Sequence, residues 1–392
     1  MISREIQLPK KYSFFLFGPR QTGKTTLVRS EFPNALEINL LETKRHLEYL
    51  KHPELLTEQV LAASLKNLTH IFIDEVQRVP VLLDQVHELI ERFKASKKSM
   101  HFILSGSSAR KLKRGAANLL GGRALSFHLH PFTFREFGNS PPALNDIINF
   151  GTLPPIFDIP EINIKEEFLR SYVETYLKEE VVAEALTRNL SGFLRFLQSA
   201  GEMNGEQINH SGIARDVSLS HVTVKEYFMV LQDTMIGFFL QSYSQSERKR
   251  HKISEKFYFF DTGVVRALQE SLSSPAKPQT FAFGKLFETW IINEVRRFSD
   301  YHRKDFRLSF LRTANDVEVD LIIETPQGKL IAIEIKSKPN PSSFDYESGF
   351  KAIEALRPPD RKLVVCTAGV DRLVEDVAIV GYSSFLNIMK EF

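Results

Sequence analysis

The feature that most constrains this chain is a short glycine-bearing segment that directly follows an apolar run. Residues 18–26, the glycine-rich loop, read G-P-R-Q-T-G-K-T-T and come after Phe14–Phe17. This order predicts a strand, a turn and a helix, because glycines allow backbone angles that point successive N–H groups at phosphate oxygens. Lys24 adds a positive charge, and Thr25 places a hydroxyl where Mg2+ bridges the outer phosphates of a nucleotide. A chance turn is the alternative, and its strand-then-helix context disfavours it.

The glycine-rich loop therefore predicts a site for ATP and Mg2+. Every residue of the loop is a candidate nucleotide ligand: Gly18, Pro19, Arg20, Gln21, Thr22, Gly23, Lys24, Thr25 and Thr26.

A second apolar run, His70–Asp74, ends in two carboxylates. In a parallel sheet that carries the loop, this strand end would lie beside the phosphates. We expect Asp74 to hold Mg2+ with Thr25, and Glu75 to polarise the attacking water. Acidic residues commonly end strands, so the pattern becomes informative only together with the loop upstream.

The next apolar run, His101–Ser105, ends in hydroxyl side chains. Ser105 is a candidate for sensing the terminal phosphate and positioning the water, and an ordinary turn with serines is an equal alternative. A cation supplied across a subunit boundary would stabilise charge on the transferred phosphoryl group, and we expect Arg123 to fill this role. The remaining cations of this stretch are more simply a solvated or phosphate-attracting surface: Arg110, Lys111, Lys113 and Arg114.

Length and composition limit the class of protein. A chain of 392 residues is too long for one ordinary core. The net charge is only +3 at pH 7, so contact with nucleic acid depends on local basic patches. The single cysteine, Cys366, excludes an internal disulfide, and no apolar stretch approaches the roughly 18 residues that cross a bilayer. Residues 1–10 lack the apolar core of a signal peptide, so we expect a cytoplasmic protein without membrane association.

Changes of pattern divide the chain into four predicted regions. These are an α/β P-loop domain with a parallel sheet (1–135), a helical linker or lid region (136–200), a winged helix-turn-helix (201–261) and a C-terminal α/β domain (262–392). Strands of the first region are expected at residues 14–17, 35–39, 70–74, 101–105 and 124–130. In the last region a helix at 283–298 precedes strands at 307–311, 317–323 and 330–335, a helix near residue 350 and a strand at 363–366.

Residues 213–227 read I-A-R-D-V-S-L-S-H-V-T-V-K-E-Y, the spacing of a helix-turn-helix. The turn spans 217–219, and the second helix is expected to bury Val222 and Tyr227 or their neighbours. Candidate DNA contacts are Ser220, His221, Thr223 and Lys225 on the second helix and Arg248, Lys249, Arg250 and Lys252 in a following wing. A plain protein-interaction or spacer module is the alternative.

The C-terminal region contains the residues of a PD-(D/E)XK arrangement. Glu288 lies on the first helix, Asp320 on one strand, and Glu334 and Lys336 two apart on the next, where they share a face. Two carboxylates can hold Mg2+ while the lysine helps to activate a hydrolytic water. An inactive domain of the same fold, which binds DNA or partners only, is an equal alternative.

Together these motifs resemble a widespread group of bacterial and archaeal AAA-type ATPases that join a P-loop module to a C-terminal domain of unknown function. The resemblance rests on G-P-R-Q-T-G-K-T-T, I-F-I-D-E-V-Q, L-S-G-S-S-A-R-K-L, G-R with H-P-F-T-F-R-E-F, S-Y-V-E-T-Y-L-K-E-E-V, F-Y-F-F-D-T-G, G-K-L-F-E, and V-D-L-I-I with E-I-K. It implies ATP binding and hydrolysis, and a C-terminal part that looks like a winged helix fused to a restriction-endonuclease-like fold. Thr289 departs from the pattern, in which an asparagine commonly follows the glutamate.

Three functional hypotheses follow. The leading one is an ATPase that binds DNA through its C-terminal half and uses hydrolysis to move, remodel or license processing of that DNA. The others are a nucleotide-dependent switch in signalling or defence, and an ATP-gated, Mg2+-dependent nuclease. AAA-type sites often form between subunits, so we expect a homo-oligomer, with a ring as one arrangement.

Overall fold

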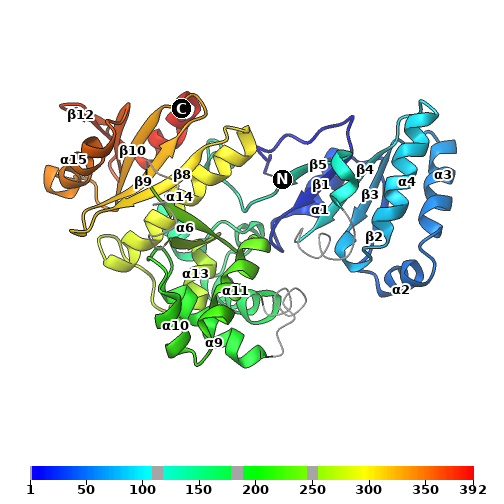
Figure 1. Cartoon of the computed structure of the whole chain (residues 1–392), viewed down its shortest axis with the longest axis horizontal. Helices are drawn as coiled ribbons and strands as arrows, with labels where there is room; N and C mark the ends of the chain where they lie inside the picture. The colour runs from blue at the N-terminus through cyan, green and yellow to red at the C-terminus, as the bar shows by residue number, and fades with distance from the viewer. Residues whose placement is uncertain (1, 108–117, 178–188, 245–254) are drawn as a thin grey trace.

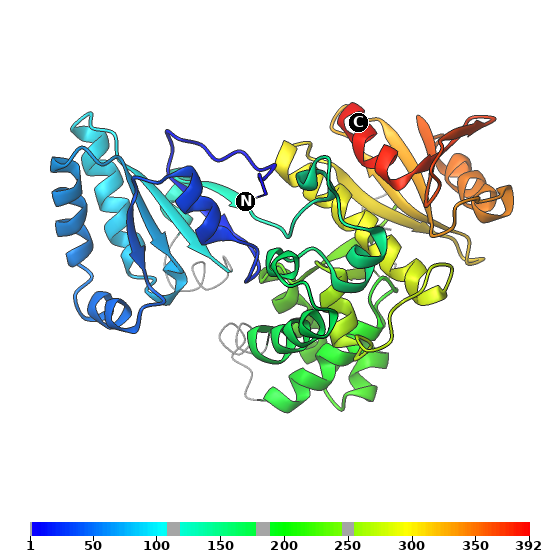
Figure 2. The ribbon, with the colours of Figure 1, turned by 180° about the vertical axis from the view of Figure 1, so that it is seen from behind.

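A computed structural model describes residues 2–107, 118–177, 189–244 and 255–392. The N-terminal α/β domain lies to one side and all later elements lie to the other, with extended segments between them (Figure 1). The same separation is visible from behind (Figure 2).

The N-terminal domain is built on a five-stranded parallel sheet of order β2-β3-β4-β1-β5. Its strands are β1 (Phe14–Phe17), β2 (Leu36–Asn39), β3 (His70–Asp74), β4 (His101–Gly106) and β5 (Leu125–His128). The helices are α1 (Lys24–Glu31), α2 (Thr43–Lys51), α3 (Leu55–Leu65), α4 (Leu82–Ala95), and the short η1 (Val76–Arg78) and η2 (Asn118–Gly122). All five predicted strands are therefore confirmed, with bounds shifted by a few residues at most.

Side chains alternate between the two faces of this sheet, and each face has its own core. Phe15, Phe17 and Ile73 pack under α3 and α4. Phe14, Leu16 and Phe72 pack with α1 on the other face. The second core also contains Tyr301, which belongs to a helix of the C-terminal half. The two halves of the chain therefore share buried apolar contacts.

The middle of the chain is mainly helical, as predicted. Its elements are η3 (Phe134–Phe137), α6 (Leu144–Phe150), η4 (Pro154–Asp158), α7 (Ile162–Ser171), the π-helical turn η5 (Tyr172–Leu177), α9 (Leu190–Glu202), α10 (His210–Asp216), α11 (His221–Asp233) and α13 (Thr262–Leu268).

An eight-stranded mixed sheet of order β12-β13-β11-β10-β9-β8-β6-β7 forms the C-terminal half. Its strands are β6 (Gly237–Ser242), β7 (Lys256–Phe259), β8 (Arg307–Arg312), β9 (Glu318–Glu324), β10 (Leu330–Lys336), β11 (Arg361–Cys366), β12 (Arg372–Val374) and β13 (Val377–Gly381). Helices α14 (Phe281–His302), α15 (Glu347–Leu356), α16 (Tyr382–Ile388), η6 (Ser343–Asp345) and η7 (Met389–Glu391) accompany it.

The strands that follow the helix-turn-helix segment are part of this same sheet. β6 pairs in parallel with β8, and one apolar core runs from Ile147 to Met389. The sheet thus extends across the predicted boundary at residue 261, and the four-region division stays a prediction.

Candidate functional site

The glycine-rich loop connects β1 to α1 in a conformation that only small residues permit at two positions. A Cβ on Gly18 would lie 2.3 Å from the backbone oxygen of Leu129. Gly23 has a φ of 90°, in the left-handed region, and directly precedes α1. The loop therefore passes close to the backbone of Leu129 after β1 and leads directly into the amino end of α1.

The lysine of the loop is held inside the loop itself. Lys24 is buried, and its Nζ donates to the backbone oxygens of Gly18 at 2.7 Å and Pro19 at 3.1 Å. The buried Thr22 hydroxyl also donates to the oxygen of Pro19, at 2.9 Å. The Lys24 ammonium thus lies against the backbone oxygens at the start of the loop.

Polar side chains at the carboxyl ends of β3 and β4 meet the start of α1. Thr25 Oγ1 donates to Asp74 Oδ2 at 2.7 Å, and the Ser105 hydroxyl donates to the other oxygen of the same carboxylate. Glu75 follows with a φ of 59°, a left-handed conformation that costs about 1–3 kcal/mol for a residue with a side chain. The backbone N–H of Glu75 donates to Ser105 Oγ at 3.1 Å.

Gln77 also belongs to this site, although the sequence motifs do not predict a role for it. It is buried, and its Nε2 donates to Glu75 Oε2 at 2.5 Å and to Ser107 Oγ at 3.2 Å. Its Oε1 is buried without a hydrogen-bond partner among the residues that the structure describes. The only signal in the sequence is its place two residues after Glu75, at the end of I-F-I-D-E-V-Q.

The donor set of this site fits a nucleotide with Mg2+. Mg2+ prefers oxygen ligands, which the Thr25 hydroxyl and Asp74 carboxylate offer side by side. An ammonium and the amides at a helix start suit phosphate oxygens. The structure places these predicted site residues close together: Gly18, Gly23, Lys24, Thr25, Asp74, Glu75 and Ser105.

The other predicted ligands of the loop take different positions. The backbone oxygen of Arg20 accepts a hydrogen bond from the Tyr172 hydroxyl at 3.1 Å. Gln21 has a φ of 65° and, like Thr26 on α1, is exposed. Arg20 thereby joins the loop to the π-helical turn of the middle region.

Arg123 does not lie at the glycine-rich loop of its own chain. It precedes β5 and so lies at the end of the sheet where the parallel strands begin, while the loop follows the end where they finish. Its guanidinium pairs with Glu91 on α4. Only a neighbouring subunit could bring Arg123 to the nucleotide, so its role stays a prediction. The cations at 110, 111, 113 and 114 lie outside the described residues.

A buried interdomain joint connects the loop to α14, and it centres on Arg4. The Arg4 guanidinium donates to the Thr22 backbone oxygen at 2.9 Å, to Glu136 Oε1 at 3.0 Å and to the Tyr301 hydroxyl at 3.1 Å. Tyr301 in turn accepts the backbone N–H of His130 at 2.9 Å. The Arg4 guanidinium therefore contacts the glycine-rich loop, the segment that contains Glu136 and a helix of the C-terminal half.

His130 strengthens the joint through the neighbouring residue of α14. Its Nε2 lies 2.7 Å from Asp300 Oδ2. Burial lowers the pKa of His130 to about 4, so the imidazole is neutral near pH 7 and donates its N–H to the carboxylate.

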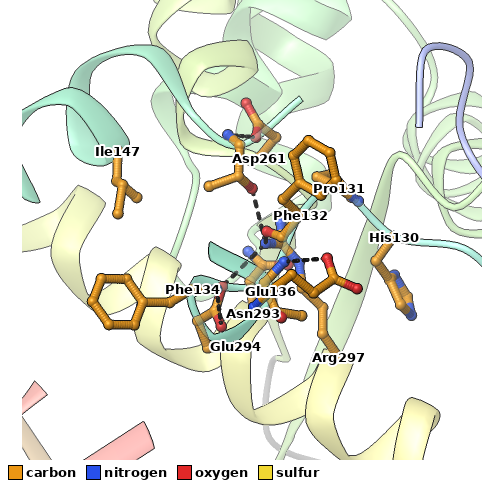
Figure 3. Close-up of polar contacts among 12 residues, drawn as sticks. His130, Pro131, Phe132, Phe134, Glu136, Ile147, Asp261, Asn293, Glu294 and Arg297 are labelled. Atoms are coloured by element: carbon orange, nitrogen blue, oxygen red, sulfur yellow. Dashed lines mark hydrogen bonds and ion pairs between the residues drawn. The ribbon is translucent and has the colours of Figure 1, made fainter. Parts of the chain in front are cut away.

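Arg297, one turn earlier on α14, contacts two further segments of the chain (Figure 3). It donates to the backbone oxygens of Phe132 at 2.9 Å and Phe260 at 2.7 Å and pairs with Glu294 at 3.2 Å. Burial raises the pKa of Glu294 to about 7, and its carboxylate also accepts the N–H of Phe134. Asp261 accepts the N–H of Thr152 from the same region. Residues of the motifs H-P-F-T-F-R-E-F and F-Y-F-F-D-T-G thus both form hydrogen bonds with α14, and these bonds are part of the joint.

The helix-turn-helix segment contains two helices, α10 and α11, at the predicted positions. Ser220 begins α11, and its Oγ accepts the N–H of Thr223 at 3.0 Å. His221 and Lys225 are exposed, whereas Val222 is 52 % exposed rather than buried. Val224 is buried with Tyr227 instead, because positions three and four apart share a helix face. The wing residues 248, 249, 250 and 252 lie outside the described residues, and the winged-helix assignment stays a prediction.

The predicted nuclease-like residues also come together, but with two lysines among them. Lys336 Nζ lies 2.6 Å from Glu334 Oε2 and 3.2 Å from Asp320 Oδ2. Lys256, which the sequence patterns did not single out, lies 3.3 Å from Glu288 Oε1 and also contacts Glu318. We call these six residues the carboxylate–lysine cluster. It borders a cleft of about 480 Å³ beside the start of α14.

Burial and charge act in opposite directions in this cluster. Burial raises the pKa of Glu288, and burial with the neighbouring Asp320 raises the pKa of Glu334 well above its ordinary value. Burial alone would raise the pKa of Asp320, but Lys336 and Lys256 hold it below its ordinary value. Burial alone would lower the pKa of Lys256, but Glu288 and the other carboxylates raise it. Both lysines are therefore charged near pH 7.

The parallel sheet and the loop between β1 and α1 define the N-terminal part as a P-loop nucleotide-binding domain. A family model described as an AAA domain matches residues 10–138. Two models for domains of unknown function match residues 142–275 and 283–385. The N-terminal AAA-type domain expected from the motifs is thereby supported, and neither later model describes a winged helix or a nuclease.

Relatives cover most of the chain. An uncharacterized protein of Mycobacterium tuberculosis is 26% identical over 328 residues, covering 83% of this chain and 70% of its own length. Another from Methanocaldococcus jannaschii is 24% identical over 397 residues, covering 94% and 85%. Among solved structures, the replication initiator DnaA bound to AMPPCP and single-stranded DNA has a TM-score of 0.30 at 13% identity, covering 57% of this chain and 82% of that one. No helix among the described residues is long and apolar enough to span a membrane.

Proposed function

We propose that this protein binds ATP with Mg2+ at the glycine-rich loop and hydrolyses it to ADP and phosphate. The observation that carries the proposal is the convergence of three strand ends on one point. The loop after β1 leads into Lys24 and Thr25, and Thr25 forms one hydrogen-bonded group with Asp74 from β3 and Ser105 from β4. Mg2+ supplies charge neutralisation at the outer phosphates when it is bound.

The residues of the site have distinct roles in this proposal. Lys24 and the loop amides bind phosphate oxygens, and Thr25 and Asp74 hold the cation. Glu75 polarises the attacking water, and its left-handed backbone turns it away from the strand direction toward the site. Gln77 orients the Glu75 carboxylate through its hydrogen bond, and Ser105 positions the Asp74 carboxylate.

Replacement of Lys24 by alanine tests the phosphate site. Loss of the buried ammonium is expected to abolish turnover and to weaken ATP binding, measured by a coupled ATPase assay and calorimetry with Mg2+. Lys10→Ala is the matched control, because Lys10 is an exposed lysine that pairs with Glu31 at the surface. Unchanged turnover in Lys24→Ala contradicts the proposal.

Replacement of Glu75 by glutamine separates binding from hydrolysis. The amide retains the shape of the side chain but cannot accept the proton of the attacking water, so ATP is expected to stay bound and unhydrolysed. Glu31→Gln is the control, because Glu31 is the last residue of α1, at the opposite end of that helix from the loop, and pairs with Lys10 at the surface. Normal turnover in Glu75→Gln would remove this residue from the mechanism.

We infer for the C-terminal half a contact with DNA through α11. Exposed Ser220, His221 and Lys225 lie at its amino-terminal turns, next to the two-helix turn that suits a major groove. Lys225→Ala is expected to weaken duplex binding several-fold and to reduce its salt dependence, whereas Glu226→Ala, one residue along the helix, is not. Fluorescence anisotropy with labelled duplex at two salt concentrations measures both.

The joint between the loop and α14 favours a second candidate, a nucleotide-dependent switch. Arg4 contacts both Thr22 of the loop and Tyr301 of α14, so the nucleotide state can bias the C-terminal half without DNA-driven cycling. ATPase rates with duplex, forked and single-stranded DNA discriminate the two. Strong stimulation by one of these DNAs supports the DNA-dependent ATPase, and no stimulation supports the switch.

A further inference from the structure

The carboxylate–lysine cluster does not fit the metal that its sequence pattern implies. The PD-(D/E)XK pattern needs two carboxylates with free oxygens for a divalent cation. Among the residues that the structure describes, no group of three or more His, Cys, Asp or Glu side chains is arranged to hold a metal ion. The side chain of Lys256 adds a positive charge beside these carboxylates.

Lys256 reaches the cluster from β7 and is buried there. Its side chain is 1 % exposed, and its ammonium contacts Glu318 and lies 3.3 Å from Glu288 Oε1. The backbone of Lys256 pairs with Leu240 in the β6–β7 ladder and with Gln207 in an isolated bridge. The backbone of Lys256 is therefore fixed on both sides, which keeps its side chain within reach of the cluster.

A buried ammonium needs carboxylate partners, because taking a charge out of water is costly unless it is paired. One partner of Lys256, Glu288, is also a carboxylate that the metal pattern uses, while Asp320 and Glu334 are paired with Lys336. A divalent cation at these oxygens would meet the positive charge of Lys256 at close range. Lysine and metal therefore compete for one position.

Further protein donors engage one oxygen of Glu288 and one oxygen of Asp320. Glu288 Oε1 accepts the Tyr258 hydroxyl at 2.6 Å in addition to Lys256. Asp320 Oδ2 accepts the Ile335 N–H at 2.7 Å and the ammonium of Lys336. The cleft next to the cluster gives solutes access, so the exclusion of a metal is electrostatic rather than steric.

We propose that the Lys256 ammonium is the resident cation of this cluster, and that the C-terminal domain neither binds a divalent metal nor cleaves DNA there. The domain then acts only by binding DNA or a partner. The two lysines and four carboxylates of the cluster stabilise its interior. This inference does not depend on the proposed ATPase, because it concerns other residues.

Titration with Mn2+ in the absence of nucleotide, followed by the electron paramagnetic resonance signal of the free ion, tests the proposal. Wild type and Asp320→Asn are expected to bind Mn2+ identically. Lys256→Met keeps the length of the side chain but frees the carboxylates. This variant is expected to gain a Mn2+ site at least tenfold tighter than any site of wild type. The double variant Lys256→Met with Asp320→Asn is expected to lose that site. Lys256→Arg, which keeps the charge, gains none.

Two results would overturn the proposal. One is Mn2+ binding by wild type that Asp320→Asn abolishes, and the other is a folded Lys256→Met protein that gains no site. If Lys256→Met does not fold, the comparison of wild type with Asp320→Asn still decides. Mg2+- or Mn2+-dependent cleavage of any DNA structure that is lost in Asp320→Asn also overturns it.

Discussion

Replacement of Arg4 by methionine removes the buried cation that holds the glycine-rich loop to α14. The Arg4 and Glu136 side chains are only 7% and 0% exposed, so their ion pair is shielded from water. Loss of one partner from a buried pair costs about 3–5 kcal/mol, because the other charge stays buried alone. A Coulomb energy of about 4 kcal/mol for charges 4 Å apart at an effective dielectric constant of 20 agrees with this range. We therefore expect Arg4→Met to lower the free energy of unfolding by about 4 kcal/mol.

Urea unfolding measures this loss, and the single tryptophan reports on it directly. Trp290 lies on α14, and its ring packs against Phe134 with centroids 5.8 Å apart, close to the joint. Glu136→Gln alone and combined with Arg4→Met completes a double-mutant cycle. The double variant is expected to lose at least about 1.5 kcal/mol less than the sum of the single variants, because it leaves no unpaired charge. Arg29→Met, which breaks an exposed pair with Glu37, is expected to cost below about 1 kcal/mol.

Arg4→Met should also weaken ATP binding. Arg4 donates to the Thr22 backbone oxygen at 2.9 Å, and a hydrogen bond from a charged group contributes about 1.5–3 kcal/mol. A loss of about 1.4 kcal/mol in loop positioning corresponds to a tenfold rise in the Kd of ATP, which calorimetry detects. An Arg4→Met protein as stable as Arg29→Met, with additive behaviour toward Glu136→Gln and unchanged ATP affinity, would refute this account of the joint.

Two further predictions concern the loop and the joint. Gly18→Ala would place a Cβ 2.3 Å from the Leu129 backbone oxygen, so calorimetry should show ATP binding weakened more than tenfold with little change in Trp290 fluorescence. Burial lowers the pKa of His130 to about 4, below its ordinary 6.5, so between these values the unfolded chain binds a proton that the folded chain does not. The contribution of His130 to stability should therefore fall as the pH drops from about 6.5 toward 4, by at most about 1.4 kcal/mol per pH unit, while Glu294, with a pKa of about 7, acts in the opposite direction. Thermal melting should accordingly show that lowering the pH from 7 to 5 is more favourable for the stability of His130→Asn than for that of wild type.

Local sequence predicted the strands and the nucleotide site because both depend on short-range patterns. The run His70–Asp74 is apolar, and the structure has a strand with the same bounds. Thr25, Asp74 and Ser105 could be grouped in advance, since parallel strands carry their carboxyl ends to one edge of a sheet. Here the topology alone brings the residues together.

The joint and the resident lysine could not be predicted in the same way. Arg4 meets Glu136 and Tyr301, which are 132 and 297 residues away, and no local pattern relates such positions. Lys256 lies just before an apolar stretch, where a lysine is normally exposed, and only the pairing of β7 with β6 places it inside. The sequence predicts that α11 buries Val222 and Tyr227 or their neighbours, and the structure buries Tyr227 with Val224 and leaves Val222 exposed.

Helix α14 unites the features that the motifs left separate. Tyr301 and Glu288 lie 13 residues apart on it, about 20 Å along the axis at 1.5 Å per residue. Tyr301 lies in a core of the N-terminal domain and Glu288 in the carboxylate–lysine cluster, so we expect a displacement of the loop at Thr22 to reach the cluster through this helix. Coupling between binding sites is reciprocal. If a ligand of the C-terminal half displaces α14 and thereby changes the affinity for ATP, then ATP must change the affinity for that ligand by the same factor. The joint mutants then separate coupling from catalysis, because Arg4 contacts the loop backbone and none of the groups assigned to the attacking water.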